Sequence, residues 1–133
     1  MATIDLVNKT MTQFALPPMP WINCRVEPPN TPVHGITLTP DGKKIWITSV
    51  SDSGVYVYDI ATKTVGKKLI VGECPNWISM SHDGKYAAVS NADTDDTSIM
   101  DIKTEKEIAR IKVGKAPKRL KVIEVPQEQL TQN

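Results

Sequence analysis

The chain has 133 residues, with 16 lysines and arginines, 15 aspartates and glutamates, and a formal net charge of +1. This balance argues against a dedicated nucleic-acid surface, which shows as a strong basic excess, and no apolar run approaches the roughly 18 residues that a membrane span needs. Aromatic residues make up only 5% of the chain while proline occurs 10 times, as expected of a turn-rich β protein.

The chain contains one segment written twice, 42 positions apart. His34–Lys43 aligns with Asn76–Lys85, and Val57–Thr62 aligns with Ile99–Thr104. A period of this length is typical of a four-stranded propeller blade. The sequence therefore predicts an all-β fold of β-propeller blades, with two complete four-stranded antiparallel blades and partial blades at both ends.

The first predicted elements are the end of a blade. Ile4–Met11 matches Tyr58–Val65, which predicts the end of a third strand and then a fourth strand near Met11–Leu16. Residues 1–16 are thus a partial blade made of its last two strands.

An irregular insertion, residues 17–30, follows this partial blade. It holds five of the ten prolines together with Trp21 and Cys24. A tryptophan on an insertion at a propeller face is a natural anchor for a protein partner, so Trp21 is a candidate partner-binding residue; the alternative is that it folds back over an exposed blade. Cys24 and Cys74 either form one disulfide or remain two free thiols. No Cys-x-x-Cys motif occurs, so covalent haem attachment and a thiolate zinc motif are unsupported.

The first complete blade spans residues 31–72. Its first turn contains Asp41 and Gly42, because an Asp-Gly pair supplies both a side-chain acceptor and a residue that tolerates positive φ. The strands are expected, in chain order, at Val33–Thr39, Lys44–Ser49, Val55–Asp59 and Val65–Val71.

The second complete blade spans residues 73–114 and repeats this order. A first strand of a further blade is expected within 115–125, near Arg119–Val125, and a polar tail at 126–133. The strands of the second blade are expected at Trp77–Ser81, Tyr86–Asn91, Thr97–Ile102 and Glu107–Val113.

These pieces resemble the YVTN family of β-propeller repeats. The residues that carry the resemblance are Asp41-Gly42-Lys43 followed by an apolar strand ending in Ser49, then Val55-Tyr56-Val57-Tyr58-Asp59, with their counterparts 42 positions later. Trp46 and Ala88 stand where the family usually has tyrosine. The resemblance covers 31–125 well and 3–16 weakly, and it implies a fold rather than an activity, because the family hosts many roles.

Two blades and two fragments do not close a propeller, which needs about four to eight blades. We expect the missing blades to come from copies of this chain or from another subunit, and a C-terminal part of a larger propeller fits the repeat better than closure on identical copies. The reason is that joining the opening strands to the closing one still lacks a second strand.

Three residues at equivalent points of the innermost strands are the candidate ligand-binding residues: His34, Asn76 and Lys118. Projecting near one rim of the channel, they would bind an anion, a carboxylate-bearing ligand or a metal-bound cofactor; the alternative is that His34 only ends the strand and contacts solvent. Trp77 and Arg119 come one position later, so strand alternation turns them away, toward the neighbouring blade or the rim. Arg119 is therefore a candidate partner contact.

The remaining acidic and histidine residues are expected to be structural. Asp41 and Asp83 lie in Asp-Gly turns, and His82 is an exposed turn residue. The loop at 91–96 offers several oxygen ligands for calcium, but it lacks an EF-hand pattern and is expected to be a solvated acidic loop. With two histidines, the chain cannot build a three-histidine metal site alone.

Two functions of different classes are open at this point. The first is a non-catalytic scaffold that binds a ligand or protein, since no serine elbow, phosphate loop or paired-carboxylate motif is present and no cofactor is predicted. The second, implied by the resemblance, is part of an exported redox enzyme whose propeller holds a non-covalent haem or a copper centre, like nitrite or nitrous oxide reductases. The resemblance also implies a periplasmic or cell-surface location, although residues 1–5 show no secretory signal.

Overall fold

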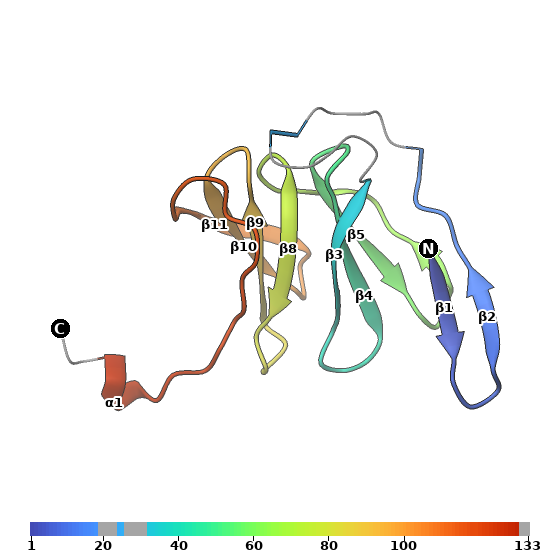
Figure 1. Ribbon diagram of the computed structural model, residues 1–133. Helices are drawn as coiled ribbons and strands as arrows, with labels where there is room; N and C mark the ends of the chain where they lie inside the picture. Colours follow the sequence, from blue (N-terminus) through green and yellow to red (C-terminus); the bar gives the residue numbers. More distant parts are fainter. Residues whose placement is uncertain (19–23, 26–31, 131–133) are drawn as a thin grey trace.

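The computed structural model describes residues 1–18, 24–25 and 32–130 and is built almost entirely of antiparallel sheet. Figure 1 shows two antiparallel sheets standing side by side, with a separate hairpin beside the first of them. The fold class is confirmed: the structure is all-β, and its two large sheets are propeller blades, with a partial blade, the hairpin, on the N-terminal side. The hairpin is β1 (Ala2–Asp5) and β2 (Thr10–Gln13), and one helical turn, α1 (Gln127–Leu130), lies near the C-terminus.

The two blades repeat each other strand by strand. The first consists of β3 (Val33–Leu38), β4 (Lys44–Ser49), β5 (Gly54–Asp59), β6 (Thr64–Val65) and β7 (Leu69–Ile70). The second consists of β8 (Pro75–Met80), β9 (Tyr86–Asn91), β10 (Asp96–Asp101) and β11 (Lys106–Lys112).

The fourth strand carries one extra residue in both blades. In blade 1 it is divided into β6 and β7, which both pair with β5, whereas in blade 2 the register of β11 shifts opposite Ile99 and Met100. A β-bulge of this kind bends a strand and increases its twist. The one strand expected at Val65–Val71 is therefore two short strands.

The Asp-Gly turns form as expected. Thr39 Oγ1 donates to Asp41 Oδ1 at 2.7 Å, and Gly42 has a φ of 73°. In blade 2, Ser81 Oγ donates to Asp83 Oδ1 at 2.7 Å, and Gly84 has a φ of 69°. The structural role of both carboxylates is confirmed.

The turn of blade 2 gives a pH-dependent prediction. The bond from Ser81, followed by the backbone N–H of Lys85, lowers the pKa of Asp83 to about 2, below its value in the unfolded chain. This stabilisation is present above the unfolded pKa of 3.8 and is lost as the pH falls through about 2. We expect Asp83→Asn to lower the urea midpoint at pH 7 and to have little effect at pH 2; an equal effect at both pH values would contradict it.

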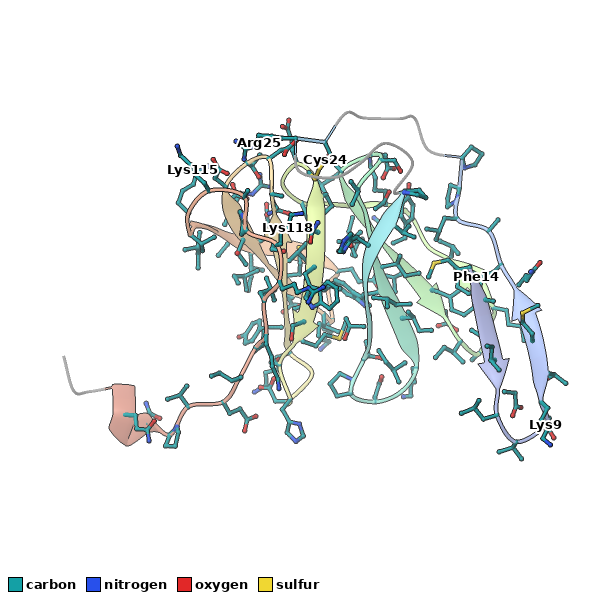
Figure 2. All side chains as sticks on the ribbon, viewed as in Figure 1. Lys9, Phe14, Cys24, Arg25, Lys115 and Lys118 are labelled. Atoms are coloured by element: carbon teal, nitrogen blue, oxygen red, sulfur yellow. A yellow bond between two sulfur atoms is a disulfide. The ribbon has the colours of Figure 1, made fainter. Side chains whose placement is uncertain are left out.

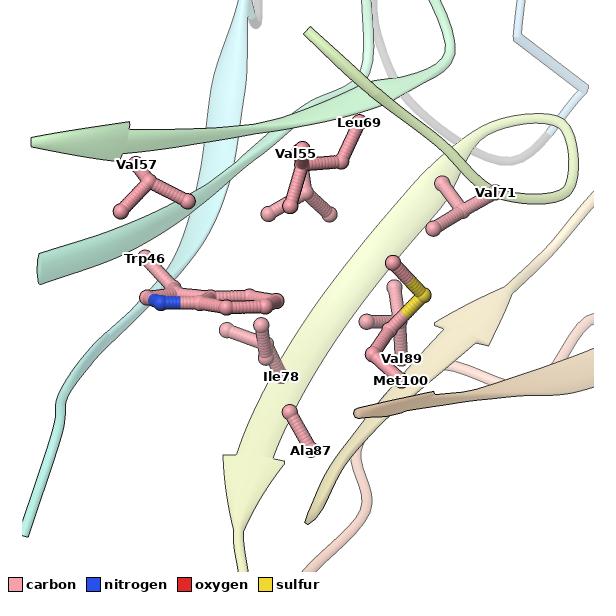
Figure 3. Close-up of a cluster of buried hydrophobic side chains, with 9 residues drawn as sticks. All are labelled: Trp46, Val55, Val57, Leu69, Val71, Ile78, Ala87, Val89 and Met100. Carbon is pink, nitrogen blue, oxygen red and sulfur yellow. The ribbon is translucent and has the colours of Figure 1, made fainter. Parts of the chain in front are cut away.

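The hydrophobic core lies between the two blades. Figure 3 shows the Trp46 ring reaching from β4 toward Ile78 of β8, with valines of β5 above it. Trp46, Val55, Ala87, Val89 and Met100 are completely buried. Burying such side chains contributes roughly 1.5–3 kcal/mol each, so this cluster joins the blades. Its full membership is Trp46, Val55, Val57, Leu69, Val71, Ile78, Ala87, Val89 and Met100.

A hydroxyl on the second strand of each blade links that blade to the next. Thr48 Oγ1 accepts from Gly35 N at 2.7 Å and lies 3.3 Å from the carbonyl of Asn76. The approach is close: a Cβ on Gly35 would lie 2.9 Å from Trp77 Cα. Ser90, the counterpart of Thr48, accepts from Trp77 N at 3.1 Å and donates to the carbonyl of Lys118.

Removing this hydroxyl tests its role. We expect Thr48→Val, which keeps the side-chain shape, to lower the free energy of unfolding by about 1–3 kcal/mol, because the buried N–H of Gly35 loses its acceptor. Thr97→Val, at a half-buried threonine of β10, is the control and should change stability by less than about 0.5 kcal/mol. Urea unfolding followed by circular dichroism measures both, and equal effects would contradict the prediction.

The segments before and after the two blades each contact a blade. Phe14 stacks on Tyr58 of blade 1 with ring centroids 4.1 Å apart, and Val122 N donates to Ser79 Oγ at 3.1 Å. The segment expected as a strand near Arg119–Val125 is not a strand in the structure, although Val122 contacts β8. The reason is that no second strand is available to pair with it among the described residues. No described helix has the length and apolar character needed to cross a membrane.

Candidate ligand site on the inner strands

Three side chains from successive inner segments form a row. His34, on β3, contacts Trp77, on β8, in an edge-on arrangement with ring centroids 5.9 Å apart. The guanidinium of Arg119, on the following segment, lies 5.6 Å from the Trp77 ring centroid. A guanidinium over an aromatic ring, with an imidazole beside that ring, is a group of side chains that can bind an anionic ligand through hydrogen bonds.

This row corrects the predicted site. Asn76 is completely buried, so it does not project at an open rim with His34 and Lys118, whereas Trp77 contacts His34 of the neighbouring blade. The cause is a bulge in each inner strand, because the pairing register shifts between Val33 and Ile36 and again between Pro75 and Trp77. One extra residue reverses which face a side chain takes.

The other predicted residues have different environments. Lys118 is exposed and lies beside the upper part of β8 (Figure 2), with its carbonyl bonded to Ser90. His82 is exposed in its turn, as expected. Trp21 lies outside the described residues. Ligand binding by His34, Asn76 and Lys118, and partner binding by Trp21 and Arg119, stay predictions.

Cys24 and Cys74 form a disulfide, with their Cα atoms 5.7 Å apart. Both are buried, and they pack with Val50 and Ala92 in a small second cluster. The disulfide ties residue 24 to the loop before β8. Of the two alternatives that the sequence left open, one disulfide or two free thiols, the structure has the disulfide. Figure 2 shows Cys24 and Arg25 at the same end of the sheets as Lys115.

The acidic loop between β9 and β10 is held by bonds within the chain. Arg25 Nη2 lies 2.6 Å from Asp95, and Arg25 N donates to Asp93 at 2.9 Å. The N–H of Ala116, ahead of the bond from Arg25, lowers the pKa of Asp95. The loop thus bonds both to Arg25 and to the segment at Ala116, and it is not the freely solvated loop that the sequence predicted.

Asp96, at the start of β10, is almost fully buried. It accepts from Asn91 Nδ2 and from Thr94 Oγ1, each at 2.9 Å, and lies 3.5 Å from Lys112 Nζ. With these donors in place, its role is structural, and the calcium interpretation of the loop finds no support in this geometry.

A hollow of about 450 Å³ lies at the opposite end of β3, between the Asp-Gly turns of the two blades. Sequence reasoning did not identify it. Its lining includes Asp41, Lys44 and Asp83, and Lys44 is already paired with Glu105 at 2.6 Å, a bond that raises the pKa of the Lys44 ammonium. The charges here largely satisfy one another.

Solved structures similar to this chain are propeller-containing proteins. A hydrazine synthase of Kuenenia stuttgartiensis matches with a TM-score of 0.67 and 31% identity, covering 74% of this chain and 28% of that one. The dihydro-heme d1 dehydrogenase NirN, in complex with DHE, matches with a TM-score of 0.58 and 23% identity over 68% of this chain and 20% of its own. Apo AztD of Citrobacter koseri matches with a TM-score of 0.59 and 14% identity over 67% and 26%.

The comparisons define the class of protein. No family model matches the chain, and no curated protein matches it, whereas the structural matches and the repeated blades identify it as part of a β-propeller. The chain spans between 20% and 28% of the length of these three structures.

Proposed function

We propose that this chain is a non-catalytic, YVTN-type scaffold segment whose propeller is completed by further blades. One observation carries this proposal: apolar residues buried at the interface between the two blades have exposed counterparts on their outer faces. Leu69 and Val71 are 3% and 6% exposed, whereas the residues 42 positions later, Ile111 and Val113, are 52% and 54% exposed.

The opposite outer face shows the same difference. Ile78 of β8 is 2% exposed against blade 1, whereas its counterpart on β3, Ile36, is 53% exposed. Among the described residues, each blade therefore has one apolar face covered by its neighbour and one face with exposed apolar residues. Repeat proteins bury their faces by stacking similar units, so the partner we propose is another propeller blade, from a copy of this chain or from another subunit.

Light scattering on a sizing column tests this proposal. We expect the chain to form a discrete oligomer, or to bind a protein that supplies blades. Replacing Ile111 and Val113 by serine should abolish that association, whereas the matched control, Ile4→Ser and Leu6→Ser on the exposed N-terminal hairpin, should leave it intact. A stable monomer that neither associates nor changes with the Ile111 and Val113 substitutions would contradict the proposal.

A second candidate function is a share in an exported redox propeller with a non-covalent haem. The row of His34, Trp77 and Arg119 favours it, since an imidazole can ligate iron and a guanidinium can bind a carboxylate. The likeness to a hydrazine synthase and to a dihydro-heme d1 dehydrogenase also supports this redox role. A copper centre is less well supported, because His34 and His82 are the two histidines of the chain and lie on different elements.

Haem titration separates the two candidates. If His34 is an iron ligand, adding haem should produce a sharpened Soret band, and His34→Ala should abolish it. His82→Ala, which removes the exposed histidine, is the matched control and should leave the band unchanged. A protein that stays unchanged on haem addition, or a band that survives His34→Ala, would exclude this role.

We further propose that the protein acts in the periplasm or at the cell surface. The disulfide between Cys24 and Cys74 supports this, because disulfides persist in oxidising compartments.

A further inference from the structure

The disulfide lies beside a carboxylate that the fold places independently of it. Sulfur atoms of Cys24 and Cys74 and a carboxylate oxygen of Asp93 all lie within 4.8 Å of one another. Ligand atoms around one tetrahedral zinc ion are roughly 3.5–4 Å apart, given bonds of about 2.0–2.3 Å. Once the sulfur–sulfur bond is opened, rotation of the two side chains is enough to reach that spacing.

Backbone contacts hold these ligands without the disulfide. Ala92 N donates to the carbonyl of Cys74 at 3.0 Å, and Asp93 N donates to that of Glu73 at 3.2 Å, which continues the pairing of β8 and β9. On the other side, Arg25 Nη2 donates to the carbonyl of Ala92 at 2.6 Å, and Arg25 N donates to Asp93 at 2.9 Å. Reduction of the disulfide therefore leaves both cysteines anchored beside Asp93.

We propose that the reduced protein binds one thiophilic divalent cation, of the zinc or cadmium type, through Cys24, Cys74 and Asp93. In the redox step, a dithiol passes two electrons and two protons to the Cys24–Cys74 bond and becomes a disulfide itself. The two thiols then lose their protons as the metal binds. The pocket suits this metal because the two thiolates are soft ligands and zinc also accepts a carboxylate oxygen, with water in the fourth position.

Charge also favours occupancy by a divalent cation. Two buried thiolates beside Asp93 would place three negative charges together, which costs free energy in an apolar pocket lined by Val50 and Ala92. The metal ion and the adjacent Arg25 guanidinium offset these charges. In an oxidising compartment the disulfide occupies the same position, so the site alternates between a covalent bond and a metal according to the redox environment.

Metal titration of the full 133-residue chain, reduced with a phosphine and then freed of it, tests this proposal. We expect one cadmium ion per chain, seen as a thiolate-to-cadmium charge-transfer band, and none in the disulfide form. Cys24→Ala should abolish the band, and Asp93→Asn should weaken affinity for zinc at least 10-fold. Asp95→Asn, which removes the same charge and also a partner of Arg25, is the matched control and should change affinity less than 3-fold.

A second readout guards against variants that do not fold. In the reduced wild-type chain, zinc should slow alkylation of both cysteines at least 10-fold, while circular dichroism confirms the folded sheet. Failure of the reduced wild-type protein to bind, affinity unchanged by Asp93→Asn, or equal losses in Asp93→Asn and Asp95→Asn would each overturn the proposed site.

Discussion

Trp46→Ala is expected to lower the free energy of unfolding by about 3–5 kcal/mol. Trp46 is completely buried and belongs to the cluster that joins the two blades. Truncation removes its contacts with residues of β5 and β8 and leaves a cavity that a rigid sheet cannot close. Since a domain has only about 5–15 kcal/mol of stability in total, the variant should be partly unfolded at room temperature or separate into independent blades.

Two controls distinguish loss of packing from loss of a hydrogen bond. The indole Nε1 of Trp46 has no hydrogen-bond partner in the described part of the chain, so Trp46→Phe should cost clearly less than Trp46→Ala. Tyr86→Ala removes an exposed aromatic residue and should cost less than about 1 kcal/mol. Urea unfolding followed by far-ultraviolet circular dichroism measures all three, and a Trp46→Ala cost below 1 kcal/mol would show that this cluster does not join the blades.

Removal of the disulfide is the second change with a large expected effect. Cys24 and Cys74 are separated by 50 residues, and cross-linking a loop of that length lowers the entropy of the unfolded chain by an amount worth about 4 kcal/mol. We expect Cys24→Ala combined with Cys74→Ala to lose most of this. Alanine is chosen because serine would add a hydroxyl to the pocket with Val50 and Ala92.

Reductant provides the internal control. Metal-free wild-type protein in reductant should approach the stability of the double variant, and the variant itself should not respond to reductant. Equal stability of oxidised wild-type protein and double variant would contradict the prediction. Zinc should restore stability to the reduced wild-type protein but not to the double variant, which links this measurement to the proposed metal site.

The two types of function depend on different parts of the molecule. Blade assembly depends on the outer faces, through Ile36, Ile111 and Val113, whereas ligand binding depends on the inner row of His34, Trp77 and Arg119. Ile111 lies on β11 and Val113 directly follows it, whereas His34 lies on β3 and Trp77 on β8, so substitutions at Ile111 and Val113 should leave the inner row in place. Loss of association with retained haem binding, or the reverse, would therefore assign each property to its own surface.

Local chemistry made much of the fold predictable. The spacing of Asp41-Gly42 and Asp83-Gly84 fixed both tight turns, because only a residue that tolerates positive φ fits there. The period of 42 residues then gave the number of strands and their order. The repeat also shows which apolar positions correspond between blades, and hence which exposed positions have buried counterparts.

The candidate site was less predictable, because it depends on small shifts in pairing. A single bulged residue in β3 and another in β8 buried Asn76 and brought Trp77 beside His34. Strand alternation read from the sequence misses such a bulge. The one signal available was Gly35, whose missing Cβ permits the blades to approach, but a lone glycine does not reveal which strand it approaches.

The sequence by itself thus determined the propeller class, the two complete blades and the turns that divide them, since each of these follows from periodicity and local backbone preference. Only the tertiary structure decided that Cys24 meets Cys74 and Asp93, that Arg25 closes this junction, and that His34, Trp77 and Arg119 form a row. The disulfide, the ion pair of Arg25 with Asp95 and the ring contacts of Trp77 join residues 42 to 70 positions apart, and their geometry depends on how sheets pack and where they bulge, which no local pattern encodes.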